Sequence, residues 1–130
     1  MPLQLFVARF EADPDDVTNI LGINPTSVVR KGDLLPSGGA SRINSWASEA
    51  GLERLTNGSD HENALRQILS LLEGRTDRFA RLRDEVRPQR IVVWGDLRIG
   101  SEVEALWLDP DQMKLLSECE VGWGCDVFAP

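Results

Sequence analysis

Three acidic side chains in the C-terminal third of the chain are the first candidates for chemistry. Glu102 and Glu104 lie two residues apart in an expected strand, so both project from the same face. Asp96 lies in the expected partner strand of the same hairpin. Carboxylates that share a site can raise one another's pKa and serve as general acid and base. No base, metal ligand or oxyanion donor accompanies them nearby in the sequence, so we expect a solvated strand face.

Other catalytic patterns are missing from the sequence. His61 is the single histidine, and it falls in the first turn of an expected helix, where a surface role is usual. Cys119 and Cys125 do not combine with it into a zinc-ligand spacing. There is no Gly-x-Ser-x-Gly motif, and no Lys-Ser or Lys-Thr follows the glycines of "SGGAS". We therefore expect no enzyme, no metal and no cofactor, and two reduced cysteines.

The stretch "ILGINPTSVVRKGD", residues 20–33, is either an anion-binding loop or a corner between a helix and a strand. Gly22 suits the left-handed residue that ends a helix, and Pro25 prevents its continuation. An anion-binding loop of the usual kind needs a following helix N-terminus, which is not expected here. The corner is therefore the favoured interpretation. The alternative is an anionic-ligand site made of cations and an aromatic ring, namely Arg30, Lys31, Arg42 and Trp46.

The bulk properties indicate one globular domain over residues 1–130. The chain is 42% hydrophobic and 27% charged, and its length allows a sizeable core without disulfides or a metal. A net charge of −7 argues against direct binding of nucleic acid or of an anionic membrane. No signal peptide or membrane-spanning segment is visible, so a cytoplasmic location is expected.

The first half of the chain shows a strand, a helix and two further strands. In the strand over residues 3–10, Leu3, Leu5 and Val7 should share one face, and Phe6, Ala8 and Phe10 the other. Asp13 suits a helix N-cap, with Pro14 at the first helical position. Shorter strands are expected over residues 28–30 and 43–48.

The second half adds a pair of helices, a hairpin, a helix and a strand. Ser59 and Glu62 form a capping-box pattern, and Thr76 can cap the second helix. Gly100-Ser101 suits a two-residue hairpin turn. Asp109 repeats the Asp-Pro helix start, with Met113 and Leu116 facing the core, before a last strand over residues 121–128. The order predicts an α+β fold with a mostly antiparallel sheet of about five to six strands, helices packed on one face, and a ferredoxin-like arrangement.

The corner and its surroundings resemble a bacterial domain-of-unknown-function family, numbered 4279. The resemblance is carried by the acidic helix start, the Leu-Gly-x-x-Pro corner, a basic residue with glycine, and a following Trp strand. It covers nearly the whole chain and implies a small bacterial α+β protein, without implying any catalytic residue. The matching residues are Leu21, Gly22, Pro25, Lys31, Gly32 and Trp46.

Charge is unevenly distributed along the chain. Residues 93–130 hold eight acids against two bases, whereas residues 61–92 hold seven arginines against five acids. An acidic C-terminal face suits a basic protein partner, so an immunity-like or inhibitor protein that neutralises a toxin or nuclease is expected. Open alternatives are a nucleic-acid mimic that blocks a nuclease or defence complex, a small ligand-binding or enzymatic domain, and a homodimer. The candidate partner-binding residues are Asp96, Glu102, Glu104, Asp109 and Asp111.

Overall fold

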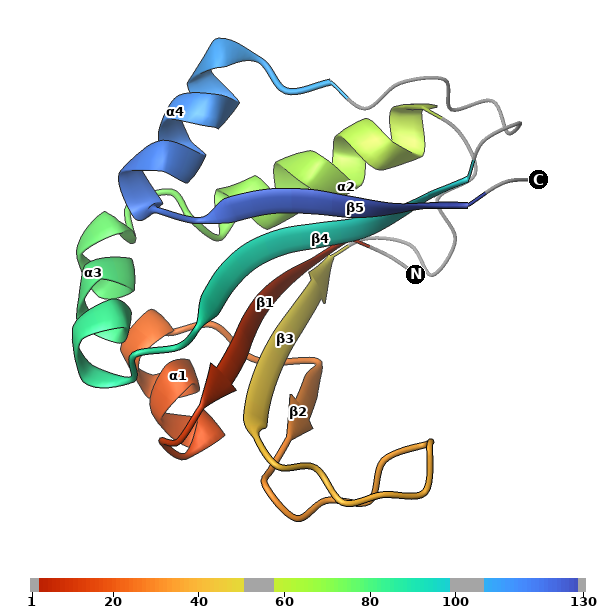
Figure 1. Ribbon diagram of the computed structural model, residues 1–130. Helices are drawn as coiled ribbons and strands as arrows, with labels where there is room; N and C mark the ends of the chain where they lie inside the picture. The colour runs from red at the N-terminus through yellow and green to blue at the C-terminus, as the bar shows by residue number, and fades with distance from the viewer. Residues whose placement is uncertain (1–2, 51–57, 99–106, 129–130) are drawn as a thin grey trace.

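The computed structural model describes residues 3–50, 58–98 and 107–128. Within these ranges the chain forms five strands and four helices (Figure 1). In chain order they are β1 (Leu3–Phe10), α1 (Pro14–Leu21), β2 (Ser27–Val29), β3 (Asn44–Ala50), α2 (Gly58–Ser70), α3 (Thr76–Glu85), β4 (Arg90–Arg98), α4 (Pro110–Cys119) and β5 (Gly122–Phe128).

The five described strands form one mixed sheet in the order β2-β3-β1-β4-β5. β1 lies at the centre and pairs antiparallel with both β3 and β4, while β2 pairs antiparallel with β3. β5 pairs parallel with β4, because α4 carries the chain back to the start of its neighbour. The first four strands and their connections follow the βαββαβ order of ferredoxin-like folds, with two helices, α2 and α3, in place of the second one. The predicted α+β class and the largely antiparallel sheet are confirmed.

One side of β1 builds the core. Leu3, Leu5 and Val7 are almost fully buried, as the alternation of the sequence predicts. Trp46 of β3 pairs opposite Val7 and is fully buried on the same side of the sheet. The helices supply further members of this core cluster: Val17, Ile20 and Leu21 from α1, Ala64, Leu65, Ile68 and Leu69 from α2, Phe79 and Leu82 from α3, and Leu116 and Cys119 from α4.

A β-bulge interrupts the regular alternation at the end of β1. The pairing register shifts between Ala8 and Phe10, and the intervening Arg9 adopts a left-handed φ of 61°. The extra residue turns Phe10 back into the core, where it is only 4% exposed. The prediction that Phe10 shares a face with Phe6 was therefore wrong, because the bulge advances the alternation by one residue.

The helix starts and stops that the sequence predicts are local and mostly confirmed. Asp13 caps α1 by accepting a hydrogen bond from the Asp15 amide, and Gly22 ends the helix with φ 67°. Asp109 and Gln112 form a reciprocal capping box at the start of α4. Both Asp-Pro pairs therefore begin helices for the same reason, which is that the carboxylate satisfies an otherwise unpaired amide.

Three local predictions were wrong. α2 begins at Gly58, so Ser59 lies within the helix and is not its cap. Thr76 is the first residue of α3, and Arg75 occupies the cap position without a side-chain bond. Met113 is 51% exposed, because α4 turns Leu116 and Cys119 toward the core. The turn proposed at Gly100-Ser101 lies outside the described residues.

Candidate functional site

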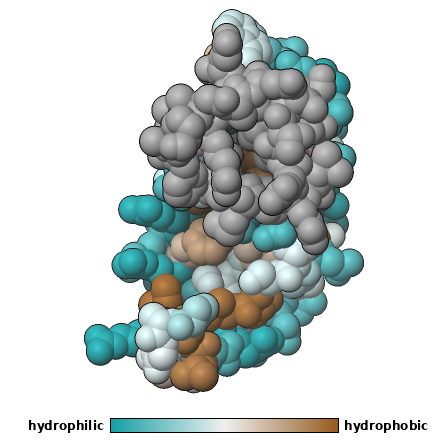
Figure 2. All heavy atoms as spheres, turned by 90° about the vertical axis from the view of Figure 1, so that its right-hand side faces the viewer, coloured by the Kyte–Doolittle hydropathy of each residue, from teal (hydrophilic) through white to brown (hydrophobic). Residues whose placement is uncertain are grey.

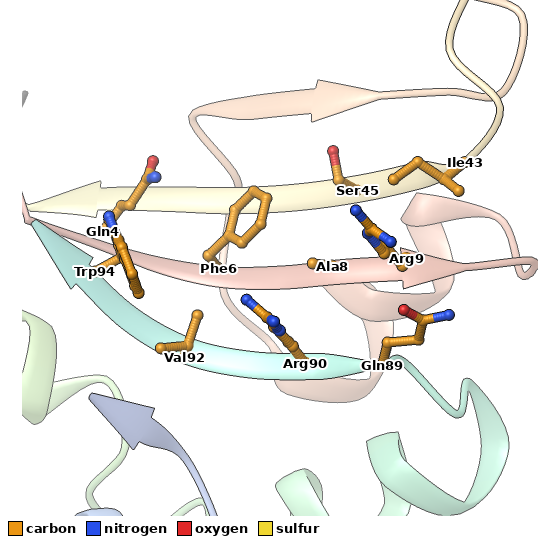
Figure 3. Close-up of a pocket in the computed structure, with 10 residues that line it drawn as sticks. All are labelled: Gln4, Phe6, Ala8, Arg9, Ile43, Ser45, Gln89, Arg90, Val92 and Trp94. Carbon is orange, nitrogen blue, oxygen red and sulfur yellow. The ribbon is translucent and has the colours of Figure 1, made fainter. Parts of the chain in front are cut away.

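The sheet face that carries Phe6 and Ala8 is hollowed. Its depression has a volume of about 510 Å³ and crosses the middle strands β3, β1 and β4 (Figure 3). The side of the molecule that is on the right in Figure 1 shows apolar side chains gathered together, with hydrophilic ones around them (Figure 2). The hollow is lined by Gln4, Phe6, Ala8, Arg9, Ile43, Ser45, Gln89, Arg90, Val92 and Trp94.

Strand pairing brings the apolar side chains of the hollow together. Phe6 lies opposite Val92 across the β1–β4 ladder, and both side chains are half-buried. Adjacent strands place such pairs within contact distance on one face. Ile43 borders the hollow just before β3 and is 37% exposed. These residues leave an apolar surface that no described helix covers.

Trp94 closes one end of the hollow and is held there by β5. Its indole lies against Gly124, the residue that pairs with it, so closely that a Cβ on Gly124 would fall 2.3 Å from the ring. The indole N–H also donates to Asp126 Oδ2 at 3.1 Å. Gly124 thus makes room for a neighbouring ring, a common role of glycine within a strand.

Two arginines stand at the other end of the hollow. Arg9 and Arg90 lie on either side of Ala8 and are both exposed (Figure 3). Arg90 is opposite Ala8 in the β1–β4 ladder, while the bulge places Arg9 beside it. The face therefore combines an aromatic and aliphatic floor with cationic groups at one end, an arrangement suited to binding rather than to proton or group transfer.

The acidic residues predicted to bind a partner lie at different places in the chain. Asp96 is in β4, where its backbone pairs with Asp126 of β5. Glu102 and Glu104 lie outside the described residues. The Asp109 carboxylate accepts a hydrogen bond from the Gln112 amide at 2.8 Å as a helix cap, and Asp111 is exposed in the first turn of α4. The described part of the chain gives Asp109 a structural role and leaves Asp111 open to solvent.

The alternative anion site is not assembled as predicted. Trp46 is fully buried, and its indole N–H donates to Thr18 Oγ1 at 3.0 Å, so a ligand cannot reach it. The two neighbouring cations already face carboxylates: Arg30 lies 3.0 Å from Asp15 and 3.6 Å from Asp13, and Lys31 lies 3.8 Å from Glu11. Arg42 is exposed and belongs to no ion pair among the described residues.

The nucleophile candidates do not form a catalytic set. Cys119 is fully buried, and burial raises the pKa of its thiol, which keeps it protonated. Its sulfur is 3.8 Å from the Thr76 hydroxyl and 3.7 Å from the Leu72 carbonyl oxygen, neither of which is a base. Among the side chains that the structure describes, no three His, Cys, Asp or Glu residues are grouped to hold a metal ion.

Sequence reasoning missed the arginines of the hollow. Arg9 and Arg90 are far apart in sequence and become neighbours only through the β1–β4 pairing. The available signal was the charge at Arg9 within an apolar strand, where an uninterrupted alternation would have placed it with Val7 in the core. A charged residue at an expected core position indicates a bulge that redirects it.

Comparison with known proteins identifies one family. The family model described as "Domain of unknown function (DUF4279)" matches residues 3–128, which is nearly the whole chain. No curated protein and no solved structure matches this chain. In the described part of the chain, no helix has the combined length and apolar character of a membrane span.

Proposed function

The chain belongs to the DUF4279 family, and we propose that it is a non-enzymatic protein-binding module of immunity or inhibitor type that docks through the hollowed sheet face. The observation that supports this most directly is the apolar floor of Phe6 and Val92, bordered by Ile43, which no helix in the described part of the chain covers. Small proteins rarely leave a contiguous apolar surface in water unless a partner covers it. Aromatic side chains at the centre and polar groups around them are typical of protein interfaces.

The overall charge favours a basic partner. A net charge of −7 attracts a basic toxin or nuclease over long range and speeds its association. Asp126 is exposed on β5, where it accepts the Trp94 indole N–H at one end of the docking surface and would meet such a partner, while the exposed Asp111 and Glu118 on α4 add to the acidic charge of the chain. The apolar floor would then supply burial, and the acidic residues would supply selectivity. The sheet face itself is central to the proposal, and the acidic surface is its refinement.

An affinity-capture experiment with paired variants tests the docking face. Ile43→Glu places a charge beside the apolar floor, whereas Leu34→Glu places the same charge on an aliphatic residue that is 80% exposed and does not line the hollow. Both changes are at surface positions, so both proteins should fold. We expect a partner that the wild type and the Leu34→Glu variant capture from the native host equally well, and that Ile43→Glu loses by about tenfold or more.

The captured partner must then bind the purified wild-type chain with the same dependence on Ile43. The proposal is wrong if the wild type captures no partner, or if a partner binds the Ile43→Glu variant as tightly as the wild type. If the partner is found, Asp111→Lys should slow its association at low salt, since exposed charges attract a basic partner over long range and act mainly on the association rate.

A further inference from the structure

A second hollow adjoins the arginine end of the sheet face. This second depression has a volume of about 350 Å³ and shares Arg9, Ile43 and Gln89 with the larger one. It adds a third guanidinium, that of Arg87, which lies just before β4. Three arginines from two distant parts of the chain therefore border two adjoining depressions at the end of the sheet, and Arg9 lines both of them.

The backbone places two of these arginines in a conformation that L-residues rarely adopt. Arg9 has a φ of 61° and Arg87 a φ of 53°, and only one other non-glycine residue among those described, Glu120, has a positive φ. The Gln89 amide is shared between the carbonyls of Ala8, at 3.0 Å, and Arg9, at 3.2 Å. This bond ties the start of β4 to the bulge. It fixes the backbone at the arginine end of the sheet, which is called the corner from here on. Residues held in such unfavourable φ values concentrate at functional sites.

The three guanidiniums have no carboxylate partners within the described residues. The ion pairs formed there involve Arg30, Lys31, Arg81, Arg83 and Lys114. Glu11 is the one acid lining the smaller hollow, and its Oε2 lies 3.8 Å from Lys31 Nζ. Arg87 donates only a long 3.4 Å bond to the Asp84 carbonyl oxygen. In a chain with a net charge of −7, three guanidiniums that pair with no carboxylate among the described residues form a local cationic site.

We propose that this corner binds a small organic anion whose oxyanion is held by Arg9, Arg87 and Arg90 and whose apolar body rests on Phe6 and Val92. Guanidinium groups match the oxygens of carboxylates and phosphates with two parallel hydrogen bonds. The larger hollow has the volume of a small-molecule site and the usual lining of apolar side chains with a few polar ones. Carboxylate and phosphate share this chemistry, and the experiment separates them.

The test is a calorimetric or NMR titration of the purified chain with four probes. Benzoate and phenyl phosphate each carry an anion on an apolar ring, inorganic phosphate lacks the ring, and phenol lacks the anion. We expect at least one of the two ring-bearing anions to bind about tenfold more tightly than inorganic phosphate, and phenol to show no binding. The tighter of benzoate and phenyl phosphate identifies the oxyanion that the corner prefers.

Variants assign the binding to the corner. Arg90→Gln should weaken the preferred anion by about tenfold, the loss expected for one charge-assisted contact. Arg9→Asn and Arg87→Asn should do the same, and asparagine tolerates the left-handed φ, so these variants should fold. Arg81→Gln is the matched control, because that arginine is paired with Glu85 on α3 and lies outside both hollows. Thermal unfolding of each variant checks its fold.

The proposal is overturned if neither ring-bearing anion binds, or if the preferred anion binds Arg90→Gln and Arg81→Gln equally. It is also overturned if inorganic phosphate binds as tightly as phenyl phosphate and benzoate, since the apolar floor would then play no part. These titrations need no protein partner. Their failure would leave the docking proposal standing, and the loss of that proposal would leave the anion site intact.

Discussion

The guanidinium of Arg78 lies so close to Gly22 that a Cβ built on the glycine would fall 2.3 Å from Arg78 Nη1. The same nitrogen donates to the Leu21 carbonyl oxygen at 3.2 Å, and Arg75 Nε donates to that oxygen at 3.1 Å. The end of α1 is therefore closed twice, by a left-handed glycine and by two arginines from the following helical pair. The close approach is possible only because residue 22 has no side chain.

Gly22→Ala should destabilise the fold beyond the usual effect of the substitution. Alanine at φ 67° costs about 1–2 kcal/mol of unfolding free energy, because its Cβ crowds the backbone. Its Cβ must also push Arg78 off the Leu21 carbonyl, which adds about 1 kcal/mol for the lost hydrogen bond. Urea denaturation of Gly22→Ala, Arg78→Gln and the double variant measures two costs in unfolding free energy: alanine at the left-handed φ, and the lost Arg78 hydrogen bond. Additive effects of the two changes would show that Arg78 does not meet residue 22 in solution.

Asp109→Ala should lower the unfolding free energy by about 1 kcal/mol, because it removes the carboxylate that accepts the Gln112 amide at the start of α4. Asp111→Ala is the matched control: Asp111 lies in the same turn, and the structure assigns it no capping bond. Its loss should cost only a few tenths of a kcal/mol through the helix dipole. Equal effects of the two changes would mean that charge, and not capping, stabilises α4.

Gly124→Ala should displace the Trp94 indole and break its bond to Asp126. The new Cβ would overlap the ring, so we expect a loss of about 1–3 kcal/mol in unfolding free energy and a changed near-ultraviolet circular dichroism spectrum. Gly122→Ala, on the same strand, is the control, since its Cβ would lie 3.5 Å from Val92 in ordinary contact. If both changes leave the spectrum unchanged, the indole does not pack on β5.

The two cysteines should differ sharply in reactivity. Cys119 is fully buried and burial raises the pKa of its thiol, whereas Cys125 is half-exposed on β5. Because the thiolate is the reactive form, iodoacetamide at neutral pH should modify Cys125 in the native protein and reach Cys119 only after unfolding. Peptide mapping at successive times reads this order directly. Early labelling of Cys119 would mean that α4 opens readily.

Local signals in the sequence predicted much of the fold. The Asp-Pro helix starts and Gly22 are self-contained, because a cap satisfies backbone groups only a few residues away. The first and last residues of β1, Leu3 and Phe10, are those that the run of apolar residues in the sequence predicted. Errors arose where a cap could be placed one residue either way, as at Ser59 and Thr76.

Long-range arrangement was harder to predict. The charge of Arg9 within an apolar strand indicates a bulge but not the left-handed φ of its backbone, and that single residue decides the face of Phe10. The parallel pairing of β5 with β4 depends on a helix-length connection that a sequence pattern leaves open. The candidate site was the hardest part to predict from the sequence, because Arg9 and Arg90 become neighbours only when β1 pairs with β4. Trp46 resembled a binding residue in the sequence and is a core residue in the structure.

The central position of β1 also sets the order in which the chain can fold during synthesis. β1 leaves the ribosome before the other four described strands, yet its two partners are β3 and, much later, the Arg90–Trp94 part of β4. Contacts between residues so distant in sequence form slowly, because a long loop must close first. Until β4 emerges, one edge of the most apolar strand stays unpaired, and such edges promote association between nascent chains. Slow translation before residue 90 would therefore lower the yield of folded protein more than slow translation after residue 98.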